Sequence, residues 1–259
     1  MYTRILNKPE ASILLFGPRG TGKSTWIQQH FSDVRSYDLL NSHEALRLSK
    51  DPSVIFQELS SLPPDSWVVI DEIQKVPTLL DEVHRLIEKQ KLKFILSGSS
   101  ARKLKHGAAN LLAGRAITTD LFPLVSSEVN FDLKFPDFFT LGMLPLAYTG
   151  ANPVDFLMSY VHTYLQEEIK AEALTRNIGA FARFLEIAAR QNAQITNCSN
   201  ISRDAMVERM TVENYFQILV DTLMGMWLPV WKLKRANQPV SHPKFYFFDS
   251  GVARALSGR

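Results

Sequence analysis

One run of eight residues, Gly17 to Ser24, restricts the fold of this chain more than any other part of its sequence. It matches the full pattern G-x-x-x-x-G-K-S/T, follows the apolar run Ser12–Phe16 and precedes a helical pattern. Glycines at these spacings let backbone N–H groups face phosphate oxygens, and the positive end of the following helix adds to the attraction. The sequence therefore predicts a phosphate-binding loop between a buried strand and a helix.

Residue types within this loop predict separate contacts with a nucleotide. Lys23 is expected to reach the β- and γ-phosphates, and the Ser24 hydroxyl is expected to bind Mg²⁺. Arg19 is expected to point outward, because the backbone supplies the phosphate contacts. The full set of residues predicted to bind the nucleotide is Gly17, Pro18, Arg19, Gly20, Thr21, Gly22, Lys23, Ser24 and Thr25.

A pair of acids follows the next apolar run. Trp67–Ile70 has the continuous apolar character of a strand buried on both faces of a parallel sheet, and Asp71 and Glu72 come directly after it. Ligands bind at the carboxyl ends of strands in open α/β sheets. We predict that Asp71 belongs to the Mg²⁺ shell and that Glu72 polarises the attacking water, which favours hydrolysis.

Two further residues complete the predicted catalytic set. Lys93–Leu96 predicts a third buried strand, and the hydroxyl of Ser97 after it, or of Ser99 as second choice, is expected to orient the water. Arg115 precedes a strand-like segment and is the candidate for stabilising transition-state charge, in this chain or in a neighbouring subunit. The predicted catalytic residues are Glu72, Lys23, Ser97 and Arg115, and the predicted metal ligands are Ser24 and Asp71.

A dense cluster of turn-forming residues at 148–153 marks a change in the character of the chain. Before it, apolar runs alternate with helical patterns such as Leu79–Lys89, which indicates βαβ units. We therefore predict an α/β P-loop NTPase domain, with a parallel sheet flanked by helices, at residues 1–150. A smaller helical and winged-helix-like domain is predicted at residues 151–259.

The second domain is predicted to be winged-helix-like because a helix, a short helix and a longer helix precede two strand-like runs joined by a polar segment. The longer helix, with Thr211 as its N-cap, corresponds to a recognition-type helix. Winged helices bind either DNA or protein, so both partners stay open. The expected helices and strands of this domain are 154–174, 179–190, 199–208, 211–224, 228–231 and 244–248.

Composition and charge restrict the kinds of protein and partner that remain possible. The chain has 259 residues, 46% hydrophobic and 21% charged, which is ordinary for one or two globular domains. A single cysteine, Cys198, cannot form an internal disulfide, and no apolar stretch approaches the roughly 18 to 20 residues of a membrane span. We expect a soluble, cytoplasmic protein without membrane contact. The net charge of +3 permits nucleic acid as a partner without arguing for it.

Several phrases of the sequence together resemble a bacterial and archaeal AAA+-like ATPase family. In that family an ATPase module precedes a helical and winged-helix domain of unknown function. The resemblance spans nearly the whole chain. It rests on the phosphate-binding loop and on the phrases Val69–Pro77, Phe94–Ser100, Leu112–Arg115, Tyr164–Ile169 and Lys244–Gly251.

The resemblance implies that ATP is the nucleotide. It places Lys23 at the phosphates and Ser24 at Mg²⁺, and it makes Asp71 and Glu72 the Walker B pair. Members of the family usually continue beyond the Asp249-Ser250-Gly251 phrase into a region that resembles a restriction-nuclease-like fold. This chain stops soon after that phrase, so the resemblance implies a shortened or naturally truncated form without a nuclease-like role.

The resemblance also implies a polar sensor at Ser97 or Ser99. Arg115 is spaced from the following strand much as the trans-acting arginine of AAA+ clamp loaders is. An arginine that acts in trans would require a homo-oligomer.

The leading interpretation is an ATPase whose hydrolysis changes the relation between the α/β module and the helical, winged-helix module. The alternative is an ATP-responsive DNA-binding regulator with little or no turnover. A small-molecule kinase or a GTPase is a further interpretation, but no Asn-Lys-x-Asp motif for guanine follows the Walker B segment.

Overall fold

The computed structural model describes residues 2–99, 112, 114–133, 135–163, 177–230 and 243–258. The chain divides into two compact units, Met1–Phe122 and Pro123–Arg259. This division lies earlier than the boundary near residue 150 that the turn-forming cluster suggested. The physical reason is that helix α6 (Phe135–Leu141) packs against helix α12 (Ser250–Leu256), which ties the segment after Phe122 to the second unit.

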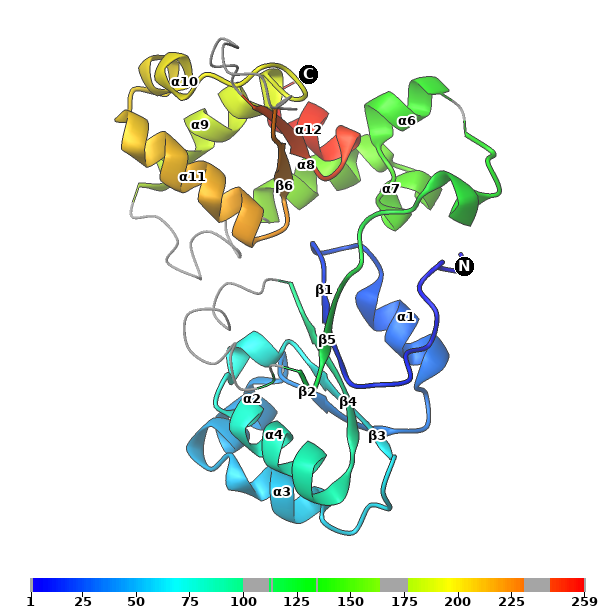
Figure 1. The fold of residues 1–259 in the computed structure, drawn as a ribbon. Coiled ribbons are helices and arrows are strands. Elements are labelled where there is room, and N and C mark those ends of the chain that lie inside the picture. Colours follow the sequence, from blue (N-terminus) through cyan, green and yellow to red (C-terminus); the bar gives the residue numbers. More distant parts are fainter. Residues whose placement is uncertain are drawn as a thin grey trace, which may run out of the picture. The chain divides into compact units, whose positions relative to one another are not determined.

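The first unit is built on a five-stranded parallel sheet with the strand order β2-β3-β4-β1-β5 (Figure 1). Its strands are β1 (Ile13–Phe16), β2 (Arg35–Asp38), β3 (Trp67–Asp71), β4 (Lys93–Gly98) and β5 (Ile117–Asp120). Phe16 pairs with Gly98, and Ile70 pairs with Leu96, so the carboxyl ends of β1, β3 and β4 share one edge. The predicted parallel α/β sheet is confirmed.

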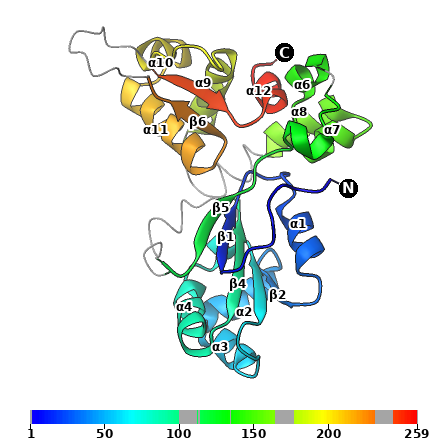
Figure 2. The same cartoon turned by 45° about the vertical axis from the view of Figure 1, so that its right-hand side comes forward.

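Helices cover both faces of this sheet, with α1 on one side and α3 and α4 on the other (Figure 2). The α-helices among the described residues of this unit are α1 (Lys23–His30), α2 (Ser42–Lys50), α3 (Ser53–Leu59) and α4 (Leu79–Gln90). On the α1 face, Val69 and Ile95 belong to the same buried cluster as Trp26. Four apolar residues of α4 are buried at helical spacing, as the pattern of Leu79–Lys89 predicted.

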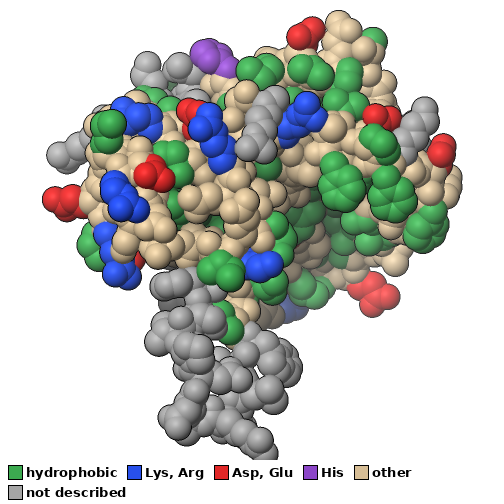
Figure 3. Space-filling view, turned by 90° about the horizontal axis from the view of Figure 1, so that it is seen from above, with side chains coloured by type: hydrophobic (Ala, Val, Ile, Leu, Met, Phe, Trp, Pro, Cys, Tyr) green, Lys and Arg blue, Asp and Glu red, His purple; other side chains and the backbone are tan. Residues whose placement is uncertain are grey.

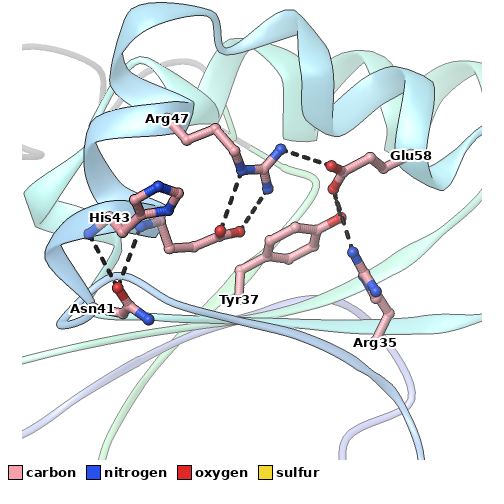
Figure 4. A network of polar contacts seen from close by, with 7 residues as sticks. Arg35, Tyr37, Asn41, His43, Arg47 and Glu58 are labelled. Atoms are coloured by element: carbon pink, nitrogen blue, oxygen red, sulfur yellow. Dashed lines mark hydrogen bonds and ion pairs between the residues drawn. The ribbon is translucent and has the colours of Figure 1, made fainter.

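The edge strand β2 has a polar sequence, and no apolar run in the chain predicts it. It pairs in parallel with β3, and side chains link it to α2 and α3 (Figure 4). The hydroxyl of Tyr37 donates to Glu58 Oε2 at 2.8 Å, and Arg47 Nη1 donates to Glu58 Oε1 at 2.7 Å. A polar network therefore helps to hold α2 and α3 against this edge of the sheet.

The second unit is mainly helical and has its own buried core. Its described helical elements are the 3-10 turn η2 (Ser126–Val129) and the helices α6, α7 (Pro145–Thr149), α8 (Pro153–Thr163), α9 (Ile178–Arg190), α10 (Cys198–Ala205), α11 (Arg209–Asp221) and α12. At its centre, the rings of Phe184 and Phe216 meet edge to face with centroids 4.9 Å apart. Aromatic packing between α9 and α11 therefore anchors this core.

An antiparallel pair of strands, β6 (Gly225–Leu228) and β7 (Lys244–Phe247), follows α11. An isolated antiparallel bridge also joins Ile195, which lies between α9 and α10, to Lys244. Strand β6 ends at residue 228, where a strand was expected to begin. Pro229 follows, and proline has no N–H to donate to a partner strand.

Helix bounds in this unit also differ in part from the sequence expectation. Glu208 is the N-cap residue of α11, and Thr211 lies inside the helix. The prediction that Thr211 is the N-cap is therefore wrong. The buried side chain of Val212 extends the apolar face toward the start of this helix. The helix expected at 154–174 is present to Thr163 in α8, and the rest of that range lies outside the described residues.

Candidate nucleotide site

The phosphate-binding loop adopts a backbone conformation that depends on its glycines. Gly20 and Gly22 have φ values of 75° and 93°, in the left-handed region that glycine tolerates. A Cβ atom on Gly17 would lie 2.2 Å from the carbonyl oxygen of Leu121, just after β5. The buried Thr21 donates its hydroxyl hydrogen to the carbonyl of Pro18 at 2.9 Å. Contacts within the protein therefore hold the loop in shape.

Lys23 turns its ammonium group back onto the loop. Its Nζ donates to the carbonyl oxygens of Gly17 at 2.6 Å and Pro18 at 3.1 Å, and the residue is only 8% exposed. A buried ammonium group needs such acceptors. A phosphate oxyanion is a stronger acceptor than a neutral carbonyl, so Lys23 can exchange these partners for phosphate.

Arg4 supports the same loop, and sequence analysis did not identify it. Its Nη1 donates to the carbonyl of Thr21 and its Nη2 to the carbonyl of Phe122, both at 2.5 Å. Nearby, Trp26 Nε1 donates to the carbonyl of Leu6 at 2.9 Å. No local pattern predicts these contacts, because they depend on the N-terminal segment folding back along α1.

The carboxylate of Asp71 lies between hydroxyl groups from two other elements. Its Oδ1 accepts a hydrogen bond from Ser97 in β4 and another from the backbone N–H of Glu72 at 3.1 Å. Its Oδ2 accepts one from the Ser24 hydroxyl, at the start of α1, at 3.3 Å. The strand register therefore brings three of the predicted site residues into direct contact.

Ser24 and Asp71 supply oxygen atoms that fit Mg²⁺. Magnesium prefers oxygen ligands in near-octahedral geometry at about 2.1 Å, which places neighbouring ligands about 3 Å apart. The separation of 3.3 Å between Ser24 Oγ and Asp71 Oδ2 is close to that value. Both oxygens could therefore face one ion, while Ser97 keeps hold of the other oxygen of Asp71.

Glu72 leaves strand β3 in an uncommon backbone conformation. Its φ of 59° and ψ of 45° lie in the left-handed region, which costs a non-glycine residue about 1 kcal/mol or more. The 3-10 turn η1 (Ile73–Lys75) begins here and buries Gln74, whose Nε2 donates to Glu72 Oε2. The same Nε2 donates to Ser99 Oγ at 3.2 Å. Gln74 was missed in the sequence, although it lies within the phrase Val69–Pro77.

Arg115 lies near the amino ends of the strands, whereas the loop lies at their carboxyl ends. It precedes β5, which runs parallel to β1, whereas the phosphate-binding loop follows the carboxyl end of β1. Its Nε donates to Glu88 Oε1 on α4 at 2.5 Å. This placement separates Arg115 from the loop of its own chain, so its predicted role fits only a neighbouring subunit's site. Of the remaining predicted residues, Arg19 is partly buried and Thr25 is exposed.

A parallel sheet with a glycine-rich loop after its first strand, and an acidic pair after a neighbouring strand, defines a P-loop nucleotide-binding domain. Comparison with known families agrees. Residues 9–130 match the family described as AAA domain, and residues 134–259 match the Domain of unknown function (DUF8612). The chain thus matches an AAA domain followed by a domain of unknown function, in the order that the resemblance of its motifs implied.

Two proteins that are similar to this chain in sequence are described as uncharacterized proteins. One, from Mycobacterium tuberculosis, is 25% identical over 253 residues, which are 95% of this chain and 56% of that protein. Another, from Haemophilus influenzae, is 21% identical over 277 residues, which are 95% of this chain and 69% of that protein. The chain therefore spans about half the length of the first of these relatives.

Solved structures with some similarity include the Aeropyrum pernix ORC1 protein in complex with DNA. It has 13% identity and a TM-score of 0.35, and the match covers 97% of this chain and 87% of that one. A DNA polymerase III gamma subunit-related protein from Thermotoga maritima has the same two values, with coverages of 83% and 95%. Similarity this weak carries no argument about the present chain. Within the described residues, no helix has the length and apolar character needed to cross a membrane.

Proposed function

We propose that the first unit binds ATP together with Mg²⁺ and hydrolyses it to ADP and phosphate. Lys23 and the backbone N–H groups of the loop hold the phosphates, and Ser24 and Asp71 hold the metal ion. When bound, Mg²⁺ supplies positive charge that offsets the charge of the phosphate oxygens. The proton transfer and the positioning of water are left to side chains of the protein.

In this proposal Glu72 is the general base. It accepts a proton from the water whose oxygen bonds to the γ-phosphorus, while the bond from that phosphorus to the bridging oxygen breaks. ADP leaves with the bonding electron pair, and inorganic phosphate is the second product. Ser97 contributes by orienting Asp71, which it contacts directly. Ser99 is the hydroxyl that Gln74 links to Glu72.

The observation that carries the proposal is the meeting of two strand ends and the start of helix α1 around one carboxylate. Ser24 from α1 and Ser97 from β4 both donate to Asp71, and Glu72 is the next residue. A pair of acids that only ended a strand in solvent would not have a fully buried serine aimed at one of them. This arrangement supports the proposal that Asp71 is oriented to bind a cation.

Phosphate release from ATP by the full chain, with and without Mg²⁺, tests the proposal. Glu72→Gln should lower kcat by about 10²- to 10⁴-fold, the usual contribution of a general base, and leave ATP binding intact. Lys23→Ala should lose ATP binding itself. Glu186→Gln is the matched control, since it removes an acid that pairs with Arg190 on α9. Undiminished turnover in Glu72→Gln would show that Glu72 is not the base.

We propose further that the second unit contains a winged helix, and that its arrangement relative to the first unit changes with the bound nucleotide. Helices α9, α10 and α11 precede the β6–β7 pair, and the Ile195–Lys244 bridge adds a third strand contact. That order is typical of winged helices. Small-angle X-ray scattering of the Glu72→Gln chain should differ between the ATP-bound and ADP-bound states, and identical profiles would contradict the coupling.

A DNA-binding regulator is the second candidate, and the charges of the described residues do not favour it. On α10 and α11 the arginines Arg203 and Arg209 are outnumbered by acids, among them Glu213, which pairs with Arg209 at 3.0 Å. In the space-filling view of Figure 3, lysine and arginine side chains are interspersed with acidic ones on the face of the molecule that it shows. DNA phosphates attract a predominantly basic surface.

The segment between β6 and β7 is where a DNA contact would have to be sought. Its sequence contains Lys232, Lys234 and Arg235, and it lies outside the described residues. Fluorescence anisotropy with duplex DNA over a range of salt concentrations decides between the candidates. Binding that weakens steeply with salt and is lost when these three residues become alanine would favour the regulator. Salt-independent or absent binding would favour the ATPase with a protein partner.

Arg115 provides the test of a homo-oligomer. If it serves the site of a neighbouring subunit, specific ATPase activity should rise with protein concentration. Arg115→Ala should then lower kcat even though Arg115 lies away from the loop of its own chain. Constant specific activity over a wide concentration range would rule out this role.

A further inference from the structure

The side-chain amide of Gln74 connects two polar groups that lie at the ends of different strands. Its Nε2 donates both to Glu72 Oε2, after β3, and to Ser99 Oγ, after β4. Gln74 is 3% exposed and Ser99 is 4% exposed. Bulk water therefore does not compete for the contact between them, and a hydrogen bond in such surroundings is stronger than at the surface.

Charge fixes the orientation of this amide. If its nitrogen and oxygen changed places, an oxygen would face the Glu72 carboxylate, and two acceptors would repel each other. The observed orientation leaves Gln74 Oε1 buried without a hydrogen-bond partner among the described residues, at a cost of about 1–3 kcal/mol. An amide with a purely structural role is expected to satisfy both ends. The one-sided arrangement indicates that its contact with Glu72 is what this residue supplies.

Gly98 makes room for the same amide. A Cβ atom on Gly98 would lie 2.3 Å from Gln74 Oε1. A methyl group there would therefore displace the end of the glutamine side chain. Glycine in β4 and glutamine in η1 are matched where they meet, and Gly98→Ala offers a way to move the amide without removing it.

We propose that Gln74 is a positioning residue for ATP hydrolysis, which holds the carboxylate of Glu72 and links it to the hydroxyl of Ser99. This inference rests on the proposed function. Ser99 accepts the hydrogen bond from Gln74 through its oxygen, so its own hydrogen can be donated to an oxygen of the terminal phosphate. Three hydrogen bonds then connect that phosphate to the base through Ser99 and Gln74, and Glu72 is held most firmly when ATP is present.

Steady-state ATP hydrolysis by the full chain tests the role. Gln74→Met keeps the length and burial of the side chain but removes the donor. It should lower kcat by about tenfold or more and change KM for ATP by less than about twofold.

Two companion variants separate positioning from folding. Gly98→Ala, which displaces the amide, should also lower kcat, but by less. Gln57→Met is the matched control, because Gln57 is exposed on α3. Unchanged kcat in both Gln74→Met and Gly98→Ala, with active wild type, would overturn the proposal.

A turnover-independent measurement distinguishes failure of this inference from failure of the proposed function. Wild type without ATPase activity would contradict the function itself. The side-chain amide signal of Gln74 in a ¹⁵N NMR spectrum, identified by its loss in Gln74→Met, then decides the link. It should shift in Ser99→Ala and on adding a non-hydrolysable ATP analogue, and stay in place with ADP. A signal that responds to neither change would overturn the proposal.

Discussion

Each unit of the molecule contains an important carboxylate from a phrase that carried the family resemblance, and the two carboxylates have different partners. In the first unit, Asp71 accepts hydrogen bonds from the hydroxyl groups of Ser24 and Ser97. In the second unit, the buried Asp249 accepts them from the backbone N–H groups of Met143 at 2.7 Å and Val252 at 2.9 Å. Hydroxyl groups can rotate toward a new partner, whereas backbone groups cannot leave without local unfolding.

The surroundings of Asp249 have the same structural character. The hydroxyl of Ser250 donates to the carbonyl of Phe138 at 2.6 Å, and a Cβ atom on Gly251 would lie 2.2 Å from the carbonyl oxygen of Leu141. The Asp249-Ser250-Gly251 phrase thus joins the start of α12 to the segment that ends α6. A sequence phrase therefore indicates chemistry where its polar groups contact side chains that can change hydrogen-bond partners. It indicates architecture where they contact the backbone.

Among these substitutions, Asp71→Asn has the largest expected effect on turnover. Asp71→Asn keeps an oxygen for Ser97 and the Glu72 N–H and can donate to Ser24, so the fold should tolerate it. It removes the charge proposed to hold Mg²⁺, and turnover should fall by about a hundredfold or more, equivalent to about 2.7 kcal/mol. Phosphate release and urea unfolding measured on one preparation check this. A variant with full activity would place the metal ligand elsewhere.

Glycine packing offers a second comparison between the units. Gly17 and Gly251 each lie so close to a carbonyl oxygen that a Cβ atom would approach it to 2.2 Å. Because backbone atoms are involved, each change to alanine should cost about 3 kcal/mol, the upper end for overpacking. Gly17→Ala should in addition weaken ATP binding about tenfold or more, as isothermal titration calorimetry would show.

Gly179→Ala is the control for this pair, because the nearest atom to its Cβ would be 3.7 Å away. Alanine should stabilise α9 there by up to about 1 kcal/mol. If Gly17→Ala and Gly251→Ala weakened ATP binding equally, the proposed difference between the phosphate-binding loop and the Asp249-Ser250-Gly251 phrase would be wrong.

Asp249→Asn should affect stability and spare the chemistry. Asparagine offers one acceptor in place of two, so the N–H of Met143 or of Val252 loses its buried partner. The expected loss is about 2 kcal/mol in urea unfolding of the chain. Asp137→Asn on α6 is the control, since that residue is exposed. A stable Asp249→Asn chain with impaired ATP turnover would assign this phrase to the site instead.

Sequence reasoning succeeded where a feature is local. The loop Gly17–Ser24 and the carboxyl ends of β3 and β4 follow from short runs whose apolar and polar residues change at one point. Because parallel strands end at one edge, those runs sufficed to predict that Asp71 and Ser97 lie near the loop. The apolar spacing of α4 gave its bounds within one residue.

Sequence reasoning failed where distant segments meet. Gln74 contacts Ser99 because Glu72 turns the chain through a left-handed conformation, and Arg4 contacts the loop because the N-terminal segment folds back. The position of the unit boundary depends on Asp249, which is far from residue 123 along the chain. Strand β2 was missed because its residues are polar and its edge is stabilised by side chains.

A third carboxylate, Glu58, is intermediate between Asp71 and Asp249 in the kind of partner it has. Its substitution is expected to have the smallest effect. Burial alone would raise the pKa of Glu58, but hydrogen bonds from Arg47 and Tyr37 outweigh it and lower the pKa below 4.5. Burial raises the pKa of Tyr37 to about 12, so its hydroxyl remains a donor in acid and neutral solution. The partners of Glu58 are side chains, as at Asp71, but two of them, Arg35 and Arg47, are already charged groups of the protein (Figure 4).

The lowered pKa of Glu58 determines how the free energy of unfolding depends on pH. The contribution of Glu58 to stability is present above about pH 4.5 and is lost as the pH falls through the pKa of the folded state. Glu58→Gln should therefore be less stable than wild type at pH 7, by less than about 1 kcal/mol because the pair is partly exposed. The difference in urea unfolding should shrink in acid. Glu186→Gln on α9 is the control from the other unit. A difference that persists unchanged at low pH would trace the effect of Glu58 to packing instead of charge.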